Sequence, residues 1–172
     1  MKELSVSQAI RVGRAHRKLK QTEMNVPYTQ QMLSMVENGH RALAKDMAPI
    51  LAERLDHPAL FAELARELTG FGPAWLDGPN VDLARAAVKE KCYEELREAI
   101  AAMDKFPAYL PPDAMTDGER KGRYLHLLQV MDAIEACFMY IGTQSLDYGY
   151  SMLQLSKDHY AKLKGKRYVA ST

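Results

Sequence analysis

The chain has only two cysteines among its 172 residues, Cys92 and Cys137, and neither has a second Cys or His at metal-ligand spacing. This scarcity excludes a disulfide framework and a zinc site, and we expect both residues to be buried, reduced thiols. Gly-rich phosphate loops and nucleophile elbows are absent as well. No spaced ligand set is formed by the five histidines His16, His40, His57, His126 and His159. We therefore expect no metal and no cofactor.

Long apolar runs are also lacking, because no apolar stretch reaches the ~18 residues that a membrane span requires. The amino-terminal segment Met-Lys-Glu-Leu-Ser has no apolar core of the kind that a signal peptide contains. We therefore expect a cytoplasmic protein that does not associate with membranes.

Alternating runs of β-branched residues are absent too, and apolar positions recur at three- and four-residue spacing. This pattern predicts an all-α protein. Ser5–Gln8 and Thr116–Glu119 are capping boxes, each of which predicts a helix start. In the amino-terminal part we expect helices over residues 5–18, 21–25, 29–37, 44–55 and 58–68. Beyond it we expect one helix capped by Asn80, one that starts at Thr116, and one over residues 147–164.

A break in this pattern divides the chain. Residues 69–80 contain three Gly and two Pro, which end the fifth helix and are typical of a linker. We predict a domain over residues 1–70, a linker over residues 71–80 and a carboxy-terminal helical domain over residues 81–172. A small set of amphipathic helices in that last domain cannot bury all of its apolar faces, so we expect it to assemble with a second copy.

Charge is unevenly distributed between the two ends. Residues 1–45 hold eight Lys or Arg against three acids, a net charge of +5, whereas the whole chain carries +1 and the remainder therefore −4. A basic end on an otherwise acidic protein is typical of a chain whose one end meets phosphates.

Residues 19–39 carry a resemblance to a known family. The stretch resembles the helix-turn-helix of Cro and the phage repressors (XRE type), in which a short helix and a turn precede a recognition helix that ends in Ile/Val-Glu-x-Gly. Thr29-Gln30-Gln31, followed by Val36-Glu37-Asn38-Gly39, is similar to that recognition helix. The resemblance covers residues 5–68. It implies a five-helix DNA-binding domain and a phage-repressor-like transcriptional regulator that binds operator DNA as a dimer.

The amino-terminal end of the expected recognition helix carries short polar side chains, which a helix in the major groove needs there. Gln can bond adenine at both N6 and N7, and a Thr methyl can contact a thymine methyl. We expect base contacts from Thr29, Gln30, Gln31, Ser34 and Met35.

The resemblance also implies contacts with the DNA backbone and one structural ion pair. Gln21 and Asn38 match positions that bond phosphates in the family, and nearby cations would set affinity and salt dependence. The expected phosphate-binding residues are Lys18, Lys20, Gln21, Asn38, Arg41 and Lys45. Arg14 and Glu37 align with a family ion pair that clamps the first helix to the end of the recognition helix.

The sequence departs from the family pattern at one place. The count from Leu19 to Glu37 is two residues short, and the missing pair falls near Asn25-Val26, with Pro27 where the family has a turn glycine. A degenerate helix-turn-helix that binds protein instead of DNA is therefore an alternative.

Further along the chain, Glu95 and Glu98 are three residues apart, as are Asp132 and Glu135. With these carboxylates the carboxy-terminal part resembles, more weakly, the all-α MazG-like nucleotide pyrophosphohydrolases. Those enzymes use Glu-x-x-Glu on one helix and Glu-x-x-Asp on the next to bind Mg²⁺. Gln129 stands where the second motif has its first Glu. The chain is therefore expected not to be an enzyme, with a pyrophosphohydrolase as the alternative; its Mg²⁺ ligands would be Glu95, Glu98, Asp132 and Glu135.

Overall fold

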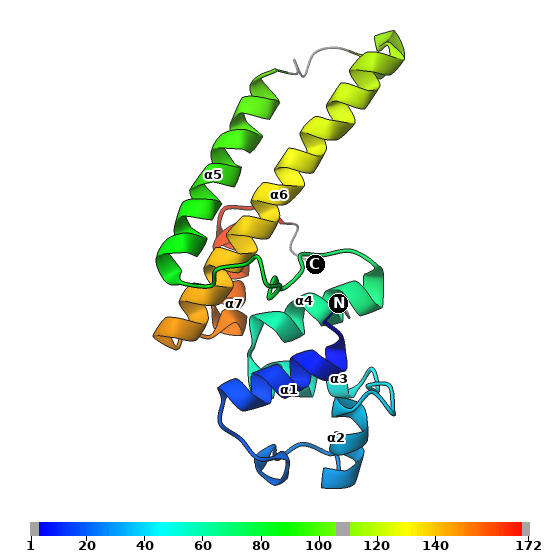
Figure 1. Cartoon of the computed structure of the whole chain (residues 1–172), viewed down its shortest axis with the longest axis vertical. Coiled ribbons are helices and arrows are strands. Elements are labelled where there is room, and N and C mark those ends of the chain that lie inside the picture. Colours follow the sequence, from blue (N-terminus) through cyan, green and yellow to red (C-terminus); the bar gives the residue numbers. More distant parts are fainter. Residues whose placement is uncertain (1–3, 106–110, 170–172) are drawn as a thin grey trace. The chain divides into compact units, whose positions relative to one another are not determined.

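The computed structural model describes residues 4–105 and 111–169, and the protein is all-α, as expected (Figure 1). Over these residues it has seven α-helices, two short 3-10 helices and no strand. The chain forms two compact units. The first runs to Trp75 and takes in the residues from Gln144 onward; the second is Leu76–Thr143. The first change of unit falls in the expected linker, but the end of the chain groups with the first unit rather than with residues 81–143.

The first unit is built on a small helical core. Its helices are α1 (Val6–His16), the 3-10 helix η1 (Gln21–Glu23), α2 (Gln30–Glu37), α3 (Met47–Leu55) and α4 (Pro58–Thr69). Helix α1 packs against α2, α3 and α4. One apolar stripe of each helix fills the core, with fully buried side chains that include Ile10, Leu33, Val36, Leu51 and Leu60.

Gly13 explains how closely α1 can approach the neighbouring helices. A glycine inside a helix costs about 1 kcal/mol relative to alanine, so its presence there needs a packing reason. A Cβ at Gly13 would lie 3.1 Å from the Cβ of His57 and 3.4 Å from that of Leu55. The absent side chain therefore leaves room for the junction between α3 and α4.

The expected second helix, residues 21–25, is wrong in kind and length, because only the single 3-10 turn η1 forms there. Asn25 has a φ of 48°, in the left-handed region, which stops any helix. Pro27 then disfavours the helical conformation of the residue before it. The helix expected over residues 44–55 is α3, which starts at Met47 rather than Ala44. Pro49 therefore lies in its first turn, where the missing amide costs little.

The second unit contains α5 (Arg85–Asp104), the 3-10 helix η2 (Pro112–Ala114) and most of α6 (Asp117–Tyr148). Figure 1 shows α5 and α6 running antiparallel. The Sγ atoms of Cys92 and Cys137 lie 3.8 Å apart, which places the two helices side by side. We expected Asn80 to cap α5, but it does not. Instead Asp82 Oδ1 accepts a bond from the amide of Ala84, the N-cap residue, so the helix starts later.

The last helix, α7 (Met152–Gly165), also starts later than the expected residue 147. Gly149 has a φ of 71° and separates α7 from the end of α6. Ser151 Oγ accepts a hydrogen bond from the amide of Gln154 and caps the new helix. The amide of Leu153 donates to Asp56 Oδ1, which ties α7 to the rest of the first unit.

By length and composition α6 could cross a membrane, because it contains an 18-residue window with a mean hydropathy of 1.2. The expectation that the protein does not associate with membranes stays a prediction, because the core helix of a soluble protein passes the same test. Such a helix is mostly buried, however, whereas 17% of this window is buried.

Candidate nucleic-acid interface

The amino-terminal end of α2 presents polar side chains to solvent. Thr29 is the N-cap: its Oγ1 accepts a bond from the amide of Met32 at 3.2 Å, and its methyl group and hydroxyl hydrogen are left for a partner. Gln30 and Gln31 are exposed, and neither side chain is hydrogen-bonded to another residue of the described chain. Both amide groups are therefore available to a ligand.

The same exposed side of α2 continues towards its other end. Ser34 lies four residues after Gln30, and Met35 four after Gln31, so the four side chains share one side of the helix. Ser34 is half-buried and Met35 is 39% exposed. Leu33 and Val36 point into the core on the other side. Four of the five expected base-reading residues therefore lie on one side of α2, and the fifth, Thr29, caps its start.

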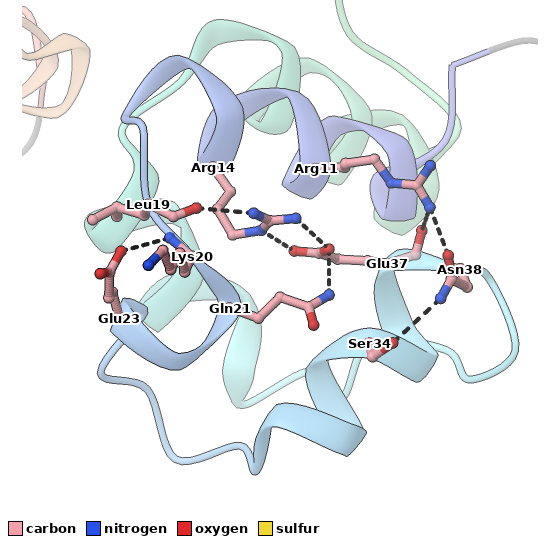
Figure 2. Close-up of polar contacts among 9 residues, drawn as sticks. All are labelled: Arg11, Arg14, Leu19, Lys20, Gln21, Glu23, Ser34, Glu37 and Asn38. Atoms are coloured by element: carbon pink, nitrogen blue, oxygen red, sulfur yellow. Dashed lines mark hydrogen bonds and ion pairs between the residues drawn. The ribbon is translucent and has the colours of Figure 1, made fainter.

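The carboxy-terminal end of α2 is fixed by Glu37 (Figure 2). Arg14 Nε donates to Glu37 Oε1 at 2.7 Å, and Arg14 Nη2 donates to Glu37 Oε2 at 2.9 Å. Burial alone raises the pKa of Glu37, but hydrogen bonds from Arg14 and Gln21 outweigh burial and hold the pKa below its ordinary value. Arg14 and Glu37 thus meet as the resemblance implies, through a two-pronged ion pair that joins α1 to α2.

Gln21 and Asn38 are bound within the protein. Gln21 Nε2 donates to Glu37 Oε2 at 2.8 Å, which uses one of its two side-chain hydrogens. Asn38 Oδ1 accepts from Arg11 Nη2 at 2.7 Å, and Asn38 Nδ2 donates to Ser34 Oγ (Figure 2). Gln21 and Asn38, which we expect to bind phosphate, therefore form hydrogen bonds that hold the carboxy-terminal end of α2 in place.

Three residues that the sequence did not single out position this surface. Arg11 donates to the Glu37 carbonyl as well as to Asn38. Arg54 of α3 donates to the carbonyls of Glu23 and Met24, at the end of η1. Tyr28 Oη accepts from the Ala44 amide, linking the turn before α2 to the segment before α3. All three make contacts between residues far apart in the sequence, and only Arg11 had a sequence signal, its three-residue spacing from Arg14 on α1.

Four of the expected cations remain exposed: Lys18, Lys20, Arg41 and Lys45. Within residues 4–105 and 111–169, no acidic side chain forms an ion pair with any of them. The Tyr28–Ala44 bond places Lys45, the next residue, near the amino-terminal end of α2. Arg41 follows the other end of α2, where its amide donates to the Met35 carbonyl. Positive charge therefore lies near both ends of the helix.

The carboxylates of the alternative enzyme site lie in the second unit. Glu95, Asp132 and Glu135 line one cavity of about 390 Å³ between α5 and α6, and Glu98 does not line it. Lys91, which also lines it, forms an ion pair with Glu95 at 2.7 Å. In the part of the chain that the structure describes, no three His, Cys, Asp or Glu side chains are grouped so that they could hold a metal ion.

Comparison with protein-family models, with curated proteins and with solved structures finds no match to this chain.

Proposed function

We propose that the protein is a sequence-specific DNA-binding regulator of transcription that inserts α2 into the major groove. The observation that carries this proposal is the pair Gln30 and Gln31, exposed at the start of a helix whose other end is clamped to the core. An α-helix such as α2 is about 10–12 Å across with its side chains, which suits a major groove about 12 Å wide.

The two ends of α2 differ in what they can do, and this difference supports the proposal. Its exposed end carries amides that can form paired bonds to adenine, each worth about 1–3 kcal/mol of discrimination against a wrong base. Its clamped end, held by Arg14 and Arg11, keeps the helix from rotating when the exposed end binds. The nearby unpaired cations would add attraction to phosphates that does not depend on sequence.

The test is to select bound fragments from a random DNA pool with the whole chain, and then to compare variants on the selected fragment and on unrelated DNA. Gln30→Ala with Gln31→Ala should lower affinity for the selected fragment by at least tenfold and leave binding to unrelated DNA nearly unchanged. Gln154→Ala, which removes an exposed glutamine from α7, is the matched control and should alter neither. Equal binding of the double variant and the control to the selected fragment would overturn base reading by α2.

A second comparison separates phosphate contacts from base contacts. Arg41→Ala or Lys45→Ala should weaken binding to all sequences about equally and reduce the slope of log K against log salt by about 1. An unchanged slope in both variants would remove these residues from the interface. No binding to any DNA by the wild-type chain would favour the alternative of a protein-binding module.

A further inference from the structure

The second unit exposes a broad apolar surface on α5 and α6. We call it the hairpin face and define it by nine large side chains that are between 37% and 64% exposed. On α5 these are Tyr93, Leu96, Ile100 and Met103; on α6 they are Tyr124, Leu127, Met131, Ile134 and Ile141. A contiguous surface of this kind is unusual on a monomer and marks an interaction site.

The hairpin face has the spacing of a helix–helix interface. On α5, residues 93, 96, 100 and 103 follow one another at intervals of three, four and three. On α6, residues 124, 127, 131 and 134 repeat the same intervals, and Ile141 lies one heptad after Ile134. This is the a/d pattern by which one helix packs its side chains between those of another.

Both stripes lie on the same side of the antiparallel pair. The helices contact each other through a buried stripe that includes Cys92 and Ala99 on α5 and Ala133 on α6. In each helix the exposed stripe lies one residue further along, as Ile100 follows Ala99, and therefore about 100° around the helix axis. Because the helices run in opposite directions, the same rotation moves both stripes to one side. The hairpin face is thus two helices wide.

We propose that the hairpin face binds the same face of a second copy of this chain and forms a four-helix bundle. A two-fold axis brings a surface onto its own copy, so the heptad spacing on one side meets the same spacing on the other. Nine half-exposed large side chains offer on the order of 800 Å², which is about the area per partner that a standard stable interface buries. This inference does not rest on DNA binding.

A second copy fits this surface better than a lipid bilayer does. Asp132 and Glu135 lie in the middle of α6, and ionised carboxylates at the centre of a bilayer are costly. In a four-helix bundle they stay off the interface, because neither belongs to the hairpin face.

The test is the mass of the whole chain in solution, measured by light scattering after size exclusion at about 10–50 μM. We expect twice the 19.4 kDa of one chain. Ile134→Glu, and separately Ile100→Glu, should each give a monomer, because both put a charge at the middle of the hairpin face. Leu125→Glu is the matched control: Leu125 is on α6 and 53% exposed, but it precedes Ile134 by nine residues and so lies on the opposite side of the helix. It should remain a dimer.

Each other outcome counts against the proposal. A monomeric wild type, a dimer that survives both substitutions on the face, or a monomer with Leu125→Glu would overturn it. Binding of a monomeric wild type to neutral phospholipid vesicles would assign the face to a membrane instead. Because the substituted side chains are exposed within a single chain, circular dichroism should show helix content close to that of the wild type. If either variant loses helix, Tyr124→Lys at the far end of the stripe replaces it.

Discussion

Glu37 is buried more deeply than the arginine with which it pairs: its side chain is 2% exposed, and that of Arg14 is 19% exposed. Removing Arg14 and removing the Glu37 carboxylate should therefore have different effects on stability. Loss of the arginine leaves an ionised carboxylate inside the protein, whereas loss of the carboxylate leaves a guanidinium that reaches water and still donates to the Leu19 carbonyl.

We predict that Arg14→Met destabilises the protein more than Glu37→Gln does. An uncompensated buried charge costs about 3–5 kcal/mol, and we expect Arg14→Met in that range and Glu37→Gln at about 2 kcal/mol. Urea unfolding at pH 7, with the slope m checked for each variant, measures both. Equal losses, or the reverse order, would contradict the argument from burial.

The same pair predicts a change in pH dependence. In the wild type the pKa of Glu37 is below its ordinary 4.5, so the stability it contributes is present above pH 4.5 and is lost as the pH falls through the folded-state pKa. Without Arg14, burial should raise that pKa above its unfolded value, so stability should be lost as the pH rises. The gap in unfolding free energy between wild type and Arg14→Met should therefore be smaller at pH 4 than at pH 7. A constant gap would refute this.

We predict that the first unit loses folding stability in acid because of His57. It is 2% exposed, its ring lies 5.5 Å from that of His16, and its Nδ1 accepts from the Ala59 amide. Burial, and then the charges of His16 and Arg17, lower the pKa of His57 to about 4. Between pH 6.5 and 4 the unfolded chain binds a proton that the folded chain does not, so stability falls as the pH falls, by up to about 3 kcal/mol.

The variant His57→Asn isolates this effect, because asparagine keeps an acceptor at the N-cap but does not titrate. Unfolding free energies at several pH values between 4 and 7 should decline less steeply in the variant than in the wild type. Parallel curves for the two proteins would show that His57 does not couple folding to pH.

Cys92 should be an unreactive thiol. Burial, followed by the hydrogen bond with Cys137, raises the pKa of Cys92 to about 11. The thiolate is the reactive form, so at pH 8 the folded protein should alkylate at Cys92 on the order of 100-fold more slowly than a free cysteine. Peptide mass spectrometry after timed iodoacetamide treatment measures the rate, with the urea-unfolded chain as control. Equal rates in the folded and unfolded chain would contradict the assignment.

Much of the local structure could be predicted from the sequence because it depends on neighbouring residues. The Ser5–Gln8 capping box forms as expected, and so does the one at Thr116–Glu119. The points where helices end were harder to predict, because Gly149 and Asn25 act through a backbone conformation that depends on the residues around them. The three- and four-residue apolar spacing on α5 and α6 was visible in the sequence, but the sequence did not tell that these side chains would remain exposed in one chain.

The sequence by itself determined most of the helices and the chemical character of α2, because apolar spacing, caps and polar side chains are local properties of the chain. Only the tertiary structure decided that Arg54 holds the end of η1, that Tyr28 links the turn before α2 to Ala44, and that the apolar stripes of α5 and α6 face the same way. Those relations join residues far apart in sequence, and they arise from how the helices pack.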